Sequence, residues 1–145
     1  MASYAATVPV EFNCSQHTVY TALCDLGRYP QWNSGMTGIS HHGPMTVGLT
    51  YTTTTAVMGR VNETRIKVLH LVPNESIVLE SEAGLIAFHA EFRLTKLGPS
   101  SCSVTCDLRF EFSNLLFQLA RPVVQALTET RIRSDLEALR VLLSA

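Results

Sequence analysis

The sequence predicts a single α+β domain over residues 1–145, in which a curved antiparallel sheet wraps around a long C-terminal helix. Apolar and polar residues alternate with a period of two through residues 85–112, which is typical of strands with one buried face. From Leu115 onward the period becomes that of an amphipathic helix. A chain of 145 residues, 46% hydrophobic and 16% charged, also suits one hydrophobic core.

The first third of the chain is expected to contain a strand, two short helices and a second strand. Residues 4–12 alternate with the even positions facing inward. Ser15 is a suitable N-cap for a short helix over residues 18–26. A second short turn or helix is expected over residues 28–33, and the glycines that follow bound a strand over residues 36–42.

Five further strands are expected before the C-terminal helix, because β-branched and alternating segments recur between turn-forming glycines and prolines. These strands cover residues 47–58, 60–72, 75–82, 85–97 and 101–112. In the last two, the even-numbered residues are apolar except for Lys96, and the odd-numbered residues are mostly polar. We therefore expect these two strands to form a hairpin with one apolar face.

The last segment is expected to form a helix about 40 Å long, which Pro122 bends or divides from a short preceding turn. Its predicted apolar stripe consists of Leu119, Val123, Leu127, Ile132, Leu136, Leu139 and Leu143. Its outer face carries i,i+4 pairs of opposite charge, which favour an exposed surface. These pairs are Glu129 with Arg133, Arg131 with Asp135, and Arg133 with Glu137.

Composition argues against several classes of function. With 11 Lys and Arg against 12 Asp and Glu, the net charge is -1, so no basic patch for nucleic acid is expected. No apolar run approaches the ~20 residues of a membrane helix, and the first residues lack the features of a secretory signal. Cys102 and Cys106 would lie about 13 Å apart on one strand, too far for a disulfide. We expect free thiols in the cytoplasm, no metal, no cofactor and no stable membrane insertion.

Several short motifs, in their order along the chain, resemble the polyketide cyclase/dehydrase and lipid transport family of the Bet v 1/START-like (SRPBCC) superfamily. The motifs are DLGRYPQW at 25–32, Val47-Gly48, Val72-Pro73-Asn74 and the closing SDLEALR at 134–140. The segment 102–116 also resembles the coenzyme Q-binding branch of that family. The resemblance implies a helix-grip fold, with a seven-stranded curved antiparallel sheet, two short helices after the first strand and a long C-terminal helix gripped by the sheet.

The resemblance also implies a cavity between sheet and helix that holds a lipid, polyketide, quinone or similar hydrophobic molecule. Family register places Tyr51, Thr53 and Thr55 on the concave face, where their hydroxyls can orient a ligand. The opposite parity would place Thr50, Thr52 and Thr54 there instead. The predicted ligand-binding residues are Tyr51, Thr53, Thr55, Ile66, Val68, His70, Phe88, Phe92, Cys106, Leu108, Phe110, Leu119, Val123 and Leu127.

No residue is assigned a catalytic role. The histidines lack the spacing of a metal site, and only His70, where the strand is expected to bulge before Pro73, is expected to face the pocket. Cys106 is expected to be a buried inert thiol, because its predicted surroundings are apolar.

Three hypotheses follow. The leading one is a binder of a small hydrophobic molecule, and the first alternative is a polyketide aromatase/cyclase or dehydratase. The second alternative is a protein-interaction module without a metabolite ligand, in which Leu115-Leu116-Phe117 would form a lid, a membrane-touching tip or the contact of a homodimer.

Overall fold

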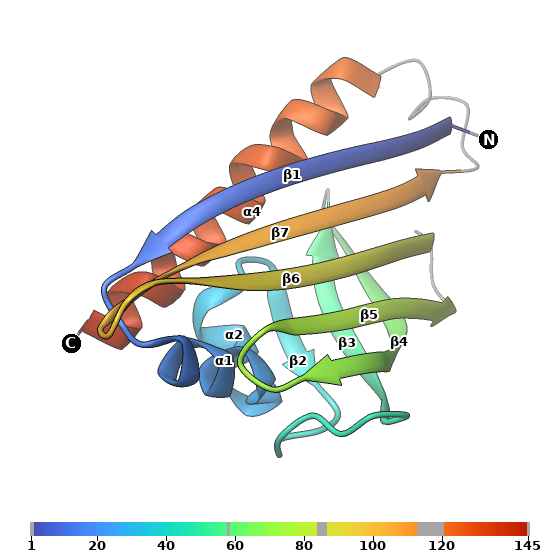
Figure 1. Ribbon diagram of the computed structural model, residues 1–145. Helices are drawn as coiled ribbons and strands as arrows, with labels where there is room; N and C mark the ends of the chain where they lie inside the picture. Colours follow the sequence, from blue (N-terminus) through green and yellow to red (C-terminus); the bar gives the residue numbers. More distant parts are fainter. Residues whose placement is uncertain (1, 58, 84–86, 113–120, 145) are drawn as a thin grey trace.

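The computed structural model describes residues 2–57, 59–83, 87–112 and 121–144. They form an α+β fold with a seven-stranded sheet and helices on its concave side (Figure 1). In chain order the elements are β1 (Ala2–Phe12), α1 (Gln16–Cys24), a 3-10 turn (Leu26–Arg28), α2 (Tyr29–Trp32), β2 (Met36–Ile39), β3 (Thr50–Val57), β4 (Arg60–Val72), β5 (Ser76–Ala83), β6 (Ala87–Gly98), β7 (Ser101–Phe112) and α4 (Arg121–Ser144).

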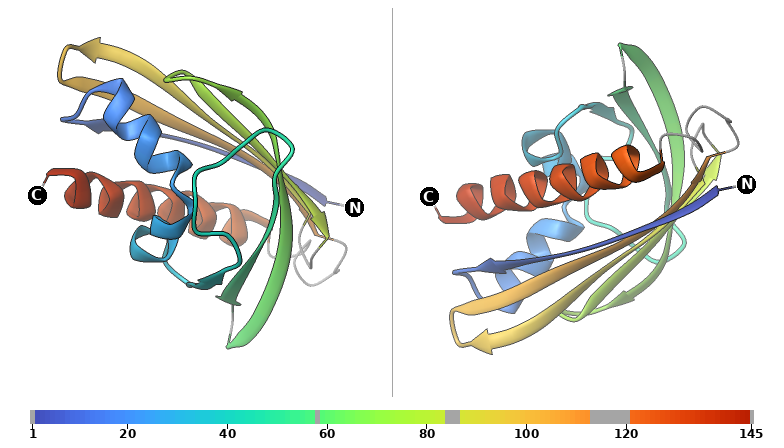
Figure 2. Two further views of the ribbon diagram at one scale, coloured as in Figure 1. Left: turned by 90° about the horizontal axis from the view of Figure 1, so that it is seen from below. Right: turned by 90° about the horizontal axis from the view of Figure 1, so that it is seen from above.

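The sheet is antiparallel throughout, in the order β1-β7-β6-β5-β4-β3-β2, so β1 and β2 form its two edges. It curves around α1, α2 and α4, which lie together on one side of it (Figure 2). Even-numbered residues of β1, β6 and β7 face this side, as their pattern predicts; Val8, Phe12, Val104 and Cys102 are almost completely buried. The predicted architecture is therefore confirmed.

The first helix begins earlier than the sequence suggests. Ser15 is its N-cap, and the Ser15 hydroxyl accepts a hydrogen bond from the backbone N–H of Thr18 at 3.2 Å. The helix ends at Cys24, because Asp25 takes an extended conformation and pairs with Pro44. The next residues form the separate 3-10 turn, so the helix predicted over residues 18–26 was wrong at both ends.

The second strand is shorter than predicted, because the chain after Ile39 turns toward the end of α1. The backbone N–H of Leu26 donates to the Gly43 carbonyl at 3.3 Å, and the N–H of Met45 donates to the Cys24 carbonyl at 2.8 Å. These bonds replace a longer pairing with β3. Strands β4 and β7 have the predicted bounds.

The apolar stripe of α4 differs from the prediction in its first half. Val123 and Leu127 are 61% and 64% exposed. Counting back from Ile132 in steps of four gives Thr128 and Val124, and these half-buried residues take the inward positions. The predicted stripe stepped by five residues between Leu127 and Ile132, which rotates its first half toward solvent.

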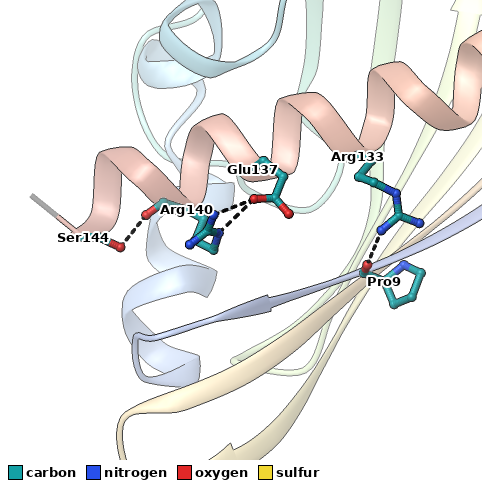
Figure 3. Close-up of polar contacts among 5 residues, drawn as sticks. All are labelled: Pro9, Arg133, Glu137, Arg140 and Ser144. Atoms are coloured by element: carbon teal, nitrogen blue, oxygen red, sulfur yellow. Dashed lines mark hydrogen bonds and ion pairs between the residues drawn. The ribbon is translucent and has the colours of Figure 1, made fainter.

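One polar contact joins α4 to the edge strand β1, and the others drawn in Figure 3 lie within the helix. The Arg133 guanidinium donates to the carbonyl of Pro9 at 3.4 Å. Arg140 pairs with Glu137 one turn earlier at 2.6 Å. Arg133 was predicted to pair with Glu129 and Glu137 on this face, but its guanidinium contacts Pro9, and Glu137 pairs with Arg140 instead.

Candidate functional site

A cavity of about 310 Å³ lies on the concave face, between the strands β3, β4, β6 and β7 and the first half of α4. Its lining residues are mostly apolar or hydroxyl-bearing. They are Asn33, Met36, Thr53, Thr55, Thr64, Ile66, Phe88, Leu108, Phe110 and Thr128. The volume falls at the lower end of the range typical of small-molecule pockets, roughly 300–1,000 Å³.

Cross-strand pairs place the aromatic and the hydroxyl-bearing lining residues on two different pairs of strands. Phe88 of β6 stands directly opposite Phe110 of β7, and paired residues share one face of an antiparallel sheet. Thr53 of β3 likewise stands opposite Thr64 of β4. The cavity therefore has an aromatic wall on one pair of strands and a hydroxyl-bearing wall on the other.

The hydroxyl wall is available to a ligand. Within the described part of the chain, the hydroxyls of Thr53, Thr55 and Thr64 make no hydrogen bond. The Thr128 hydroxyl, by contrast, donates to the Val124 carbonyl of its own helix at 2.7 Å. Three hydroxyls without a hydrogen bond to any described residue therefore line the cavity beside its apolar side chains and the Asn33 amide.

None of the described lining residues is acidic, basic or a thiol. Two titratable side chains, Cys106 and Tyr51, are buried on the same inner face of the sheet, and both are neutral near pH 7. Burial raises the pKa of the Cys106 thiol to about 12, and burial also raises the pKa of the Tyr51 phenol. These groups are therefore poorly suited to proton transfer at neutral pH.

The structure brings part of the predicted site together. The predicted residues that line the cavity are Thr53, Thr55, Ile66, Phe88, Leu108 and Phe110. Tyr51, Val68, Phe92 and Cys106 face inward but are buried in the core rather than on the cavity wall. Leu119 lies outside the described residues, and Val123 and Leu127 face solvent, as described above.

His70 does not face the cavity. The expected bulge is present between Val68 and His70, but it pairs His70 with Val78. Val78 lies between the fully or nearly fully buried Ile77 and Leu79, so it belongs to the outer face, and His70 lies there with it. The expectation that the bulge would turn His70 inward is therefore wrong.

Four cavity residues were absent from the predicted set: Asn33, Met36, Thr64 and Thr128. Thr64 was on the correct face, two residues before Ile66, and strand alternation alone identifies it. Thr128 follows from the corrected helical register of α4. Asn33 lies in the short connection between α2 and β2, and Met36 is the first residue of β2; no local pattern in the sequence marks either of them.

The connection between α2 and β2 is fastened to α4 beside the cavity. The Asp135 carboxylate accepts a hydrogen bond from the Ser34 N–H at 3.0 Å, and the Arg131 guanidinium donates to the Ser34 carbonyl. Asp135 was predicted to be on the exposed face, but it is only 8% exposed. Ser34 lies between Asn33 and Met36, so this contact holds both residues against the cavity.

Replacing Asp135 by asparagine is expected to change how stability depends on pH. Burial raises the pKa of Asp135, although the hydrogen bonds from Ser34 and the charge of Arg131 partly offset this effect. The folded state therefore holds this proton more tightly than the unfolded state. Its contribution is complete below the ordinary aspartate pKa of about 4, and it is lost as the pH rises through the raised value in the folded protein.

Urea unfolding of the unchanged protein and of Asp135→Asn between pH 4 and pH 7 measures how the free energy of unfolding of each depends on pH. Asp135→Asn should lose less stability than the unchanged protein as the pH rises across this window. Parallel curves would contradict the assignment. Glu129→Gln, which removes an exposed carboxyl from the same helix, is the matched control. Its pH dependence of stability should be that of the unchanged protein.

Two searches for other kinds of site concern the described residues alone. Within the described ranges, no three His, Cys, Asp or Glu side chains gather as a group that could hold a metal ion. In the same part of the chain, no helix combines the length and apolarity needed to cross a bilayer.

Solved structures share this fold at low sequence identity. A START superfamily protein from Mycobacterium smegmatis has a TM-score of 0.82 and 20% identity, with 97% of each chain covered. An aromatase/cyclase from a Streptomyces species has a TM-score of 0.81 and 15% identity, covering 99% of this chain and 94% of its own. A norcoclaurine synthase from Thalictrum flavum, in complex with dopamine and hydroxybenzaldehyde, has a TM-score of 0.71 and 14% identity, covering 97% of this chain and 86% of its own.

The sequence itself identifies the family. No curated protein matches the chain. The family model for polyketide cyclase/dehydrase and lipid transport proteins, however, matches residues 3–143. This match and the START-like helix-grip fold confirm the resemblance found in the motifs. The chain therefore belongs to the polyketide cyclase/dehydrase and lipid transport family.

Proposed function

We propose that this protein is a single binding domain that holds a compact hydrophobic molecule in the cavity between the sheet and α4. The observation that carries the proposal is a cavity of about 310 Å³ lined by apolar side chains and by the hydroxyls of Thr53, Thr55 and Thr64, which bond to no described residue. Four free thiols support a reducing compartment such as the cytoplasm as its location.

The two walls indicate the chemistry of the ligand. Phe88, Phe110 and Leu108 favour a flat or aliphatic body, because they offer apolar area without polar partners. Thr53, Thr55 and Thr64 favour a carbonyl or hydroxyl group along one edge of that body. A quinone, a cyclised polyketide or a short lipid has this combination.

Binding is favoured over catalysis by the character of the described cavity wall. Cyclisation or dehydration requires a group that gives or takes a proton near neutral pH, and such a group must lie within hydrogen-bond reach of the substrate. The described lining residues provide hydroxyl and amide groups only. A cyclase therefore remains the second candidate, favoured by the resemblance to an aromatase/cyclase fold.

Native mass spectrometry of the purified protein, followed by organic extraction, tests the proposal directly. A bound mass that is released into the solvent phase is the expected result. Calorimetry with naphthol as an added probe extends the test to protein that has lost its ligand during purification. A protein that carries no extractable molecule and binds neither naphthol nor a short-chain fatty acid would overturn the proposal.

Replacing Thr53 by valine is expected to weaken the binding of naphthol about 3- to 10-fold, because one hydrogen bond to the ligand is lost at nearly constant volume. Methylnaphthalene has almost the same shape but no hydroxyl, so its affinity should not fall. Calorimetric titration of both ligands measures the difference, and Thr53→Ser should restore naphthol binding. An equal loss for both ligands would show that Thr53 only shapes the cavity.

A further inference from the structure

Strands β5 and β6 separate before either strand ends. Their backbone pairing stops at Glu80 opposite His89. Beyond this pair, β5 stays with β4 as far as Ala83, which pairs with Arg65. Strand β6 stays with β7 as far as Ala87, which pairs with Glu111. The sheet therefore has a seam, which we define by Glu80 and Ser81 on one side and Phe88 and His89 on the other.

Two side-chain contacts span the seam, the ion pair of Glu80 with His89 at 3.8 Å and the hydrogen bonds of Ser81. The Ser81 hydroxyl accepts a hydrogen bond from the Phe88 backbone N–H at 2.9 Å and donates to the Phe88 carbonyl at 3.4 Å. In a regular ladder these two groups of Phe88 would bond the backbone of the facing residue. A bulge accounts for the displaced strand, since Ile66 pairs with Ser81 and Arg65 pairs with Ala83, which leaves Glu82 without an opposite residue.

The seam lies where an outer hollow meets the cavity. A hollow of about 370 Å³ is lined by outward-facing side chains of Glu80, His89, Arg109 and Glu111. It is also lined by Ser81, Phe88 and Phe110, which lie on the concave face of their strands. Phe88 and Phe110 line the cavity as well. Because residues from both faces of the sheet line this one hollow, we infer that it extends between the strands and is not confined to the outer face.

We propose that the seam is the route by which the ligand enters and leaves the cavity, with the Ser81 hydroxyl as the contact that closes it. This inference rests on the proposed function, since it requires that a ligand occupy the cavity. Passage requires β5 and β6 to part locally at Ser81 and at the adjacent Glu80–His89 pair. This breaks the two hydrogen bonds of Ser81 and separates the Glu80 and His89 side chains, but it breaks no backbone hydrogen bond, because Glu80 and His89 are a pair of the type without mutual backbone bonds. Elsewhere around the aromatic wall, β6 and β7 are paired continuously from Ala87 to Lys96.

A removable cross-link tests the route. Phe88 directs its N–H and carbonyl toward β5, so the adjacent His89 directs its own toward β7. Glu80 and His89 therefore form a pair without mutual backbone bonds, the type with the closest Cβ atoms, and their side chains meet at 3.8 Å. The double variant Glu80→Cys/His89→Cys should form a disulfide across the end of the ladder without altering the described lining of the cavity.

Stopped-flow fluorescence with naphthol measures association and dissociation rates in this variant before and after reduction. The oxidised form should exchange naphthol at least about tenfold more slowly than the reduced form, because the disulfide prevents the strands from parting. The dissociation constant should be the same in both forms, since both rates slow together. The unchanged protein under the same oxidising conditions controls for its own cysteines.

Ser81→Ala provides the opposite change. Loss of the hydroxyl should accelerate exchange about 3- to 10-fold with little effect on the dissociation constant. Ser40→Ala is the matched control, because the Ser40 hydroxyl also accepts a strand N–H, from Thr52 at 2.8 Å, but far from the seam along the sheet. This control should leave the exchange rates unchanged.

The outcomes separate the two proposals. Equal exchange rates in the oxidised and reduced double variant, with binding intact, would overturn the seam as the route while leaving the binding function standing. Absence of naphthol and fatty acid binding in the unchanged protein would overturn the proposed function instead.

Discussion

Replacing Leu139 by alanine is expected to lower the free energy of unfolding by about 2–5 kcal/mol, the range for removing a leucine side chain from a packed core. Leu139 is 0% exposed and belongs to the inward stripe of α4, where it joins the same core as β1 and α1. The loss combines the transfer of the missing carbon atoms to water with the cavity left behind. Urea unfolding at constant temperature, followed by far-UV circular dichroism, measures it.

Leu142→Ala is the matched control, three residues further along the same helix. Leu142 is 41% exposed, so its truncation should cost less than about 1 kcal/mol. A similar loss in both variants would contradict the register described for α4. A small loss at Leu139 alone would show that the core closes around the missing side chain.

Replacing Leu108 by tryptophan is expected to weaken naphthol binding by at least about tenfold, because the larger side chain occupies the space that the ligand needs. Leu108 lines the cavity opposite Ala90 and is half-buried, so the indole has the open cavity before it. Overpacking should cost about 1–3 kcal/mol of stability at most. Calorimetric titration measures the affinity, and urea unfolding measures the stability.

Leu97→Trp makes the same chemical change on β6 at a site that is 53% exposed and outside the cavity lining. It should bind naphthol as the unchanged protein does. If Leu108→Trp folds and binds naphthol with unchanged affinity, the ligand occupies some other place and this cavity is not the binding site.

The sequence predicts the strands well because their side chains face two different environments. In β7, alternation continues along the whole strand, and the predicted bounds match the structure. The predicted bounds of β4 match as well, although a bulge interrupts its alternation before His70. The short helices are less well determined. Ser15 marks the start of α1, but the end of that helix depends on a pairing between Asp25 and Pro44 that no local pattern contains.

The candidate site is predictable only where it consists of strands. Period two places Thr53, Ile66 and Phe88 on the concave face, and they line the cavity. It does not distinguish a cavity wall from filled core, and for this reason Tyr51 was placed in the site although it packs in the core at 3% exposure. That distinction depends on what stands opposite each side chain across the fold.

The helix and the bulge show two further limits. The seven-member stripe predicted for α4 contained a step of five, and only the packing of Leu136 and Leu139 shows which half keeps the correct register. His70 depends on the exact residue at which β4 bulges, and a shift by one residue reverses the face of a strand side chain.

The contact between Arg133 and Pro9 has a consequence for solubility. Strand β1 extends for 11 residues along one margin of the sheet, and such a margin can recruit a strand from a neighbouring molecule and start aggregation. Pro9 has no N–H to donate, and its carbonyl already accepts from Arg133. At this point of the margin, a strand from another molecule finds no donor and competes with Arg133 for the acceptor.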